Sequence, residues 1–151
     1  MLLEISKETE VPATPEACWL LVSDVPRLSA CIPGVSDVRE LQEGQYSATV
    51  TDKLGPFRLQ LPVTISIQEL QEPSRLAAEL RGNDGRGQAR VHGRLETTLE
   101  PSAAGTRLQL HVHMEVLGRL ASLGATPMRR RTDEIFAQFV DRVRQELTAP
   151  S

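Results

Sequence analysis

Three histidines and two cysteines are the residues of this sequence best suited to metal or acid–base chemistry. His92, His111 and His113 fall in stretches where polar and apolar residues alternate, and all three share the outward, polar positions. Cys18 and Cys31 are not spaced as Cys-x-x-Cys, and two cysteines cannot make a disulfide framework. We therefore expect surface histidines, buried and inert thiols, and no metal site.

Catalytic side chains are not evident either. The predicted strand faces bring together no Ser-His-Asp or Cys-His arrangement and no inward pair of carboxylates, and Asp52 is the one acid that we place inward, at the rim. The glycine-rich stretch 82–87 could be mistaken for a phosphate-binding loop. Such a loop needs a helix after it, whereas both flanks here have the pattern of strands. We predict a mobile hairpin loop that could gate a cavity, and no catalytic residue.

A run of arginines is the strongest charge feature. Arg129, Arg130 and Arg131 lie in the first turns of a predicted helix, where the helix macrodipole disfavours positive charge. With Arg119 nearby, they could contact anionic lipid headgroups or an acidic patch on a partner protein. The alternative is an ordinary solvated surface, because arginine far outnumbers lysine throughout the chain.

Composition indicates a globular domain. The 151 residues are 40% hydrophobic and 25% charged, which suits one domain with a sizeable core. A net charge of -3, with one Trp, one Tyr and three Phe, offers neither a basic field nor a base-stacking platform, so we expect no nucleic-acid partner. The sequence has no apolar run of about 18 residues and no signal-peptide pattern, which predicts a cytoplasmic protein.

The elements that position these residues follow from periodicity and turn residues. Two short helices are predicted to start at Thr14-Pro15-Glu16 and at Asp24. Apolar residues recur at helical spacing from Thr126 to Leu147, which predicts one long helix that Thr126 caps. Alternating segments predict seven strands, at residues 3–11, 35–42, 45–54, 57–67, 76–80, 89–99 and 108–116. This order predicts an α+β fold, with a curved seven-stranded antiparallel sheet, two short helices and one long C-terminal helix across the sheet. The first strand is expected at an edge.

The last predicted hairpin has a register that two patterns support. Pairing Leu99 with Leu108 aligns the apolar faces of both strands. It also brings opposite charges together at three outward positions: Glu100 with Arg107, Glu96 with His111, and His92 with Glu115.

Several short motifs along the chain resemble one protein family. They are Val11-Pro12-Ala13-Thr14-Pro15-Glu16 followed by Trp19, Cys31-Ile32-Pro33-Gly34-Val35, Lys53-Leu54-Gly55-Pro56-Phe57, the loop 82–87, Leu99-Glu100-Pro101 with Gly105-Thr106-Arg107-Leu108, and the stretch 118–124. Together these resemble CoxG, the family of the carbon monoxide dehydrogenase G subunit, within the START and Bet v 1-like (SRPBCC) superfamily. The likeness covers nearly the whole chain and implies the helix-grip fold as a single domain over residues 1–148.

The resemblance also implies a function. Members of the family are non-enzymatic accessory proteins that accompany molybdenum hydroxylases of the carbon monoxide dehydrogenase type and recruit them to the cytoplasmic membrane. The cavity of the fold suits a quinone or another lipid-like ligand, so a bound quinone is the one cofactor to expect. Many members end in an apolar membrane anchor. Here residues 149–151 are expected to be a short tail without one, so we expect a cytoplasmic protein with peripheral contact at the inner membrane face.

The expected cavity lies between the sheet and the start of the long helix, where several inward residues are small. Its lining residues, predicted from face alternation, are Tyr46, Ala48, Leu61, Ile65, Leu80, Val91, Leu95, Met114, Met128, Thr132, Ile135 and Phe139. Tyr46 and Thr132 would orient a quinone carbonyl, and the ligand would enter between the glycine loop and the helix.

Two other functions stay open at this point. The first is a small-molecule enzyme of the same fold, such as a polyketide cyclase, which would place several polar side chains inside the cavity. The second is an interaction module with no cavity, which docks through Arg129–Arg131. A tightly packed interior would favour the second.

Overall fold

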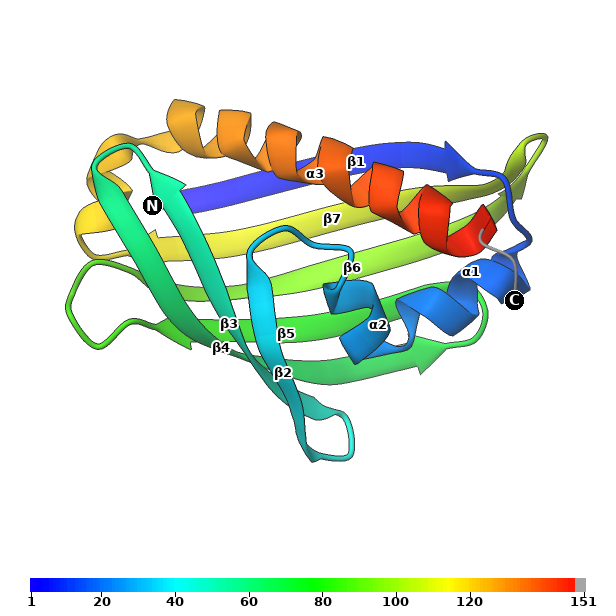
Figure 1. Ribbon diagram of the computed structural model, residues 1–151, viewed down its shortest axis with the longest axis horizontal. Helices are drawn as coiled ribbons and strands as arrows, with labels where there is room; N and C mark the ends of the chain where they lie inside the picture. The colour runs from blue at the N-terminus through cyan, green and yellow to red at the C-terminus, as the bar shows by residue number, and fades with distance from the viewer. Residues whose placement is uncertain (149–151) are drawn as a thin grey trace.

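Seven antiparallel strands form one curved sheet in the computed structural model, which describes residues 1–148 (Figure 1). The order across the sheet is β1-β7-β6-β5-β4-β3-β2, so the first strand lies at one edge beside the last. The strands are β1 (Leu2–Val11), β2 (Val35–Gln42), β3 (Gln45–Leu54), β4 (Phe57–Gln71), β5 (Arg75–Asn83), β6 (Arg90–Ser102) and β7 (Gly105–Leu117). The predicted sheet is confirmed, including the edge position of the first strand. The tail predicted at residues 149–151 lies outside the described residues.

Two short helices, α1 (Pro15–Val22) and α2 (Val25–Ser29), follow β1. Thr14 Oγ1 accepts a hydrogen bond from the Ala17 amide at 3.2 Å, and the Asp24 carboxylate accepts one from the Arg27 amide at 3.2 Å. These side chains satisfy N–H groups that the first helical turn leaves without partners. Both predicted helix starts are therefore confirmed.

The long helix α3 (Ala125–Thr148) follows a short 3₁₀ helix, η1 (Arg119–Leu123). It lies across one face of the sheet, and its C-terminal end reaches α1 (Figure 1). Gly124, at a φ of 80°, joins η1 to α3, so the helix begins at Ala125 and Thr126 is inside its first turn instead of capping it.

The apolar interior forms two clusters. One joins the sheet to α1 and to the C-terminal half of α3, and it contains Trp19, Leu21, Leu108 and Val143. The other fills the end of the fold where α3 begins; among its buried residues are Leu3, Leu59, Leu61, Val116, Leu120 and Met128. Apolar burial of this kind, at about 25 cal/mol per Å², holds the helices on the sheet.

The register predicted for the last hairpin is confirmed. Leu99 pairs with Leu108, and the three predicted outward pairs lie opposite one another between β6 and β7. Of the three predicted pairs, only Arg107 and Glu100 form a side-chain contact, at 4.0 Å, and the other two pairs do not form. Glu96 binds Arg94 and Arg75, and His92 approaches Glu79 at 3.9 Å. Backbone register is set by the inward apolar face, whereas long outward side chains can reach diagonal neighbours on either adjacent strand.

Candidate functional site

A partly enclosed apolar cavity of about 170 Å³ lies between α3, the two short helices and the sheet. The sheet contributes side chains from β1, β6 and β7, α1 contributes Val22, and α2 contributes Leu28. From α3 come Thr132, Ile135, Phe136 and Phe139, which recur at helical spacing and so share one face. The wall is almost entirely apolar, with Lys7, Thr97 and Thr132 as its polar residues.

Lys7 marks one side of this cavity. It lies on the edge strand β1 and forms an ion pair with Asp133 of α3, which bridges the gap between strand and helix. The Lys7 side chain is 27% exposed and that of Asp133 is 61% exposed, so the pair sits at the surface end of the gap. A second, open groove of about 260 Å³ adjoins it and shares Ile5, Lys7 and Thr132 with the cavity. The apolar interior therefore comes closest to solvent between β1 and α3.

Comparison with known proteins identifies the family. The sequence matches the family described as the carbon monoxide dehydrogenase G subunit (CoxG) over residues 8–148. The chain belongs to the CoxG family. A search of curated proteins finds no match.

Solved structures share the fold of this CoxG-family chain. A conserved protein from Geobacillus kaustophilus superposes with a TM-score of 0.84 at 20% identity, covering 97% of this chain and 95% of that one. A START superfamily protein from Mycobacterium smegmatis gives 0.72 at 16% identity over 95% and 96% of the chains. A protein named Ara h 8.0201 gives 0.70 at 15% identity over 99% and 100%. These superpositions confirm the predicted helix-grip fold.

Four of the predicted lining residues of this CoxG-family chain lie in the cavity wall: Leu95, Thr132, Ile135 and Phe139. The other eight do not line it, so the predicted position needs correction. Leu61 and Met128 are buried in the cluster at the start of α3, and Val91 and Met114 pack against that cluster. Ile65 packs on the other cluster, Ala48 is buried, and Leu80 is half-buried on β5. Tyr46 lies opposite Glu40 of β2, and burial together with the nearby Glu40 carboxylate raises its pKa.

Of the small inward residues, Thr97 lines the cavity, but the others do not mark empty space. A Cβ added at Gly82 would lie 2.9 Å from Val63 Cγ1, and one at Gly93 would lie 2.4 Å from the His113 carbonyl oxygen. Met128, only 6% exposed, fills the same end of the interior. Neighbouring atoms thus occupy the volume that the small residues leave, and the cavity forms nearer the middle of α3. Side-chain size alone does not locate it.

For the other lining residues, the sequence does not indicate that they face a cavity. Lys7 is at the same alternating positions of β1 as the apolar residues Leu3 and Ile5, which is the pattern of an inward residue. A charged side chain is nevertheless expected to point outward. Thr97, Leu108, Leu110 and Val112 have the alternation of inward residues, and the wall also contains Ile5, Val22, Leu28, Ile32 and Phe136. The positions of α1 and α2 above the sheet decide which inward residues reach the cavity.

The arginine run divides into two kinds of residue. Arg131 donates to both carboxylate oxygens of Asp52 at 2.9–3.2 Å and to Glu134 at 2.8 Å, and the Asp52 carboxylate raises the pKa of Arg131. Asp52 is 15% exposed, at the rim as predicted. Arg131 therefore ties α3 to β3 and is not free for a partner. Arg129 and Arg130 are exposed, and neither forms an ion pair with any side chain in residues 1–148.

Arg119 and the glycine loop belong to one local structure. The Arg119 guanidinium donates to the Arg86 carbonyl at 3.1 Å, and the amides of Arg119 and Leu120 donate to the Gly87 and Gln88 carbonyls. Asp84 accepts a hydrogen bond from the Arg86 amide, and this lowers the pKa of its carboxyl. The loop is thus bound to η1 and contributes nothing to the cavity wall, so the prediction that it gates the cavity is wrong. Both its flanks are strands, as predicted.

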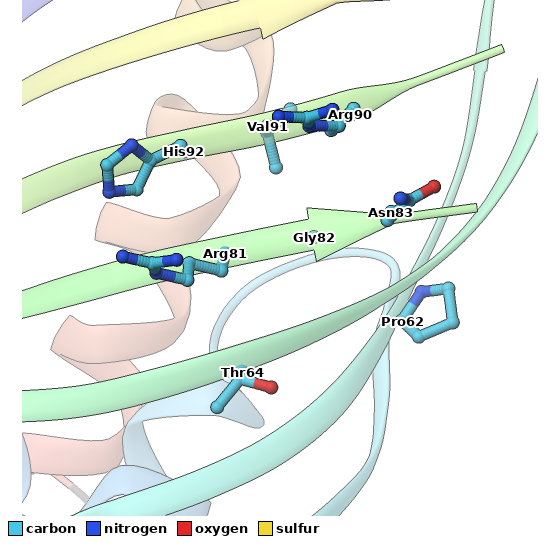
Figure 2. Close-up of a pocket in the computed structure, with 8 residues that line it drawn as sticks. All are labelled: Pro62, Thr64, Arg81, Gly82, Asn83, Arg90, Val91 and His92. Carbon is cyan, nitrogen blue, oxygen red and sulfur yellow. The ribbon is translucent and has the colours of Figure 1, made fainter. Parts of the chain in front are cut away.

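An open groove of about 410 Å³ lies beside this loop, on the face of the sheet away from α3 (Figure 2). Arg81 and His92 project there from β5 and β6, with Thr64 on β4 beneath them and Pro62, Asn83 and Arg90 nearer the strand ends (Figure 2). The groove is shallow and polar, so it lacks the enclosure that binding a small apolar ligand requires. The cavity under α3 remains the candidate site.

The remaining predicted chemical groups lie outside the cavity. Cys18 and Cys31 are free and buried, and burial raises the pKa of both thiols, which keeps them unreactive. His92, His111 and His113 project from the opposite face of the sheet.

Within residues 1–148, no group of three or more His, Cys, Asp or Glu side chains is arranged to hold a metal ion. In that same part of the chain, none of the helices combines the length and apolar character that crossing a bilayer demands.

Proposed function

We propose that this CoxG-family protein is a non-enzymatic accessory factor that binds a quinone or another lipid-like molecule in the cavity under α3. The observation that carries the proposal is the cavity itself, because it is covered by three helices, almost wholly apolar and built from the helix-grip elements. Its volume of about 170 Å³ is close to that of the roughly 150 Å³ apolar cavity that is known to hold benzene. One six-membered ring is therefore an appropriate occupant.

The ligand enters between β1 and α3 in this proposal. The adjoining groove shares Ile5, Lys7 and Thr132 with the cavity, so a tail longer than one ring can extend from the cavity into the groove. Separation of Lys7 from the exposed Asp133 opens the path. Apolar contact supplies the affinity, at about 25 cal/mol per Å² before the costs of binding.

Lys7 is the polar group best placed for the head of the ligand. Its ammonium has three N–H donors and lies at the surface end of an apolar wall, so it can donate to a carbonyl oxygen. Thr132 Oγ1 already donates to the Met128 carbonyl at 2.9 Å and is less available as a donor. In this proposal Lys7 takes the orienting role that sequence analysis assigns to Tyr46 and Thr132.

The partner of the loaded protein, in this proposal, is a molybdenum hydroxylase of the carbon monoxide dehydrogenase type, which it recruits to the membrane. The description of the family supports this link. Arg129 and Arg130 are exposed near the start of α3, Arg129 lines the entry groove, and both are suited to an acidic patch or anionic headgroups. A ligand could then pass between membrane, cavity and enzyme.

A titration with a short-chain quinone analogue tests the proposal. Leu110 lines the cavity, and Leu110→Trp fills part of it; Leu70→Trp makes the same change at a residue that is 59% exposed. We expect the wild type and Leu70→Trp to bind one equivalent, and Leu110→Trp to bind at least tenfold more weakly. Equal binding by the two tryptophan variants would contradict the cavity as the site.

The alternative of an enzyme of the polyketide cyclase type has less support. Such an enzyme needs several acid–base side chains inside, whereas this wall offers Lys7 and two threonines. The alternative of a module without a cavity is disfavoured because the interior contains one.

A further inference from the structure

Two histidine rings meet on the outer face of β7. His111 Nε2 and His113 Nε2 lie 2.7 Å apart, and the rings stand edge to face with centroids separated by 4.3 Å. They are two residues apart on a strand, so both project from the same face of the sheet. This face is opposite to the one that α3 covers, so the pair is separate from the apolar cavity.

The edge strand β1 supplies a support for each ring. Glu4 pairs with His113 in the register and Ser6 pairs with His111. Glu4 Oε1 lies 3.2 Å from His113 Nδ1, and Ser6 Oγ lies 2.7 Å from His111 Nδ1. Each Nδ1 is therefore held by the residue directly opposite, while each Nε2 is turned toward the other ring.

We propose that His111 and His113 bind one divalent transition-metal ion through their Nε2 atoms. Metal-binding histidines usually donate the other ring N–H to a carboxylate or another oxygen, and Glu4 and Ser6 provide these acceptors. Imidazole nitrogens suit Zn²⁺, Ni²⁺ and Cu²⁺, at about 2.0–2.1 Å for zinc. Two such bonds at 90–110° separate the nitrogens by about 2.9–3.4 Å, so a small rotation of the rings from 2.7 Å admits the ion.

Proton positions are consistent with this site. In the metal-free contact one Nε2 carries the hydrogen and the other accepts it. With His113 Nδ1–H donating to Glu4, the shared hydrogen belongs to His111 Nε2, and His111 Nδ1 accepts from the Ser6 hydroxyl. On metal binding the His111 proton moves to Nδ1 and the Ser6 hydroxyl turns to accept it. Both Nε2 lone pairs are then free for the metal, and no net proton is released.

The surrounding charge favours a cation. Glu4 lies beside His113 within 3.2 Å, and Glu115 is two residues away on the same face. Arg94, which lies opposite His113 on β6, is already paired with Glu69 and Glu96. Water completes the coordination around the two imidazole nitrogens.

Zinc titration of the untagged full chain tests the proposal. Calorimetry should give one zinc site per chain, and ¹H–¹⁵N spectra of the imidazole rings should report coordination at Nε2 of His111 and His113. His111→Gln and His113→Gln should each weaken zinc binding by at least tenfold, and Glu4→Gln by about tenfold. Both rings are at the surface, so unchanged circular dichroism is expected for each variant.

His92→Gln is the matched control. His92 shares the outer face but lies on β6 beside Arg81 (Figure 2), and its Nε2 approaches the Glu79 carboxylate at 3.9 Å instead of another imidazole nitrogen. Zinc binding should be unchanged in this variant. Absence of a zinc site in the wild type, or affinity that is equal in His111→Gln and the wild type, would overturn the proposal.

Discussion

At the level of single residues, the Arg131–Asp52 contact is a polar link between α3 and the sheet that contains several hydrogen bonds. The guanidinium contacts both oxygens of a carboxylate that is 15% exposed, so removal of either partner leaves a poorly solvated charge. Arg131→Met should lower the free energy of unfolding by about 1–2 kcal/mol after allowance for solvent screening. Urea denaturation measures this change.

Arg130→Met is the control for that prediction, because Arg130 is the exposed neighbour on the same helix. It should change the unfolding free energy by less than about 0.5 kcal/mol. Equal effects of the two substitutions would argue that general charge, and not the Asp52 contact, is what stabilises the helix.

A second property of single residues is acid sensitivity of the outer face. Hydrogen bonds from Arg75 and Arg94 lower the pKa of Glu69, and those from Arg94 lower the pKa of Glu96. A carboxyl with a lowered pKa in the folded state stabilises the protein above its unfolded pKa, near 4.3, and this contribution is lost as pH falls through the folded pKa. The free energy of unfolding should therefore fall below about pH 4.3.

The double variant Glu69→Gln/Glu96→Gln isolates this contribution. Its unfolding free energy should depend less on pH between about 4.5 and 3 than that of the wild type. Glu43→Gln, in the exposed turn after β2, should retain the wild-type slope. A double variant with the full wild-type slope would assign the acid sensitivity to other carboxyls.

At the level of elements, Thr106 fastens the β6–β7 hairpin to the segment between β1 and α1. The side chain is fully buried, and its Oγ1 donates to the Ala13 carbonyl at 2.6 Å. Thr106→Val keeps the shape but leaves that carbonyl with only the weak Cys18 thiol donor at 3.9 Å, which should cost about 1–2 kcal/mol. Thermal unfolding measures the cost, and Thr51→Val, at an exposed strand position, should have little effect. Similar losses in both variants would contradict this role.

The elements themselves could be predicted from sequence to a large extent. Thr14 and Asp24 are recognisable caps, and the alternation around Leu99 and Leu108 predicts a register that the structure reproduces. Such features depend on near neighbours in sequence or on one apolar face, and both are visible without coordinates.

The cavity could be predicted only in part, for a physical reason. Ile135 and Phe139 line it as expected, because they belong to the inner face of α3. Met128 belongs to the same face but fills its end of the core, and Lys7 enters the wall from an edge strand. Where space remains depends on how α1, α2 and α3 sit above the sheet, and these distances are set by tertiary packing.

At the level of the whole molecule, the two faces of the sheet have different properties. One face, with the three helices, contains the apolar cavity and presents Arg129 at the proposed entry. The other carries ion pairs, the open groove of Figure 2 and the histidine pair. A carrier needs this separation, because the ligand site must stay dry while the outer surface stays hydrated.

The central claim is that the cavity carries an apolar ligand, and native mass spectrometry of protein purified gently from its own organism tests it most directly. We predict a complex with one quinone or lipid per chain, which solvent extraction releases for identification. Protein without any ligand, and without uptake of added quinones, would contradict the claim. That result would instead favour a docking module that acts through its surface alone.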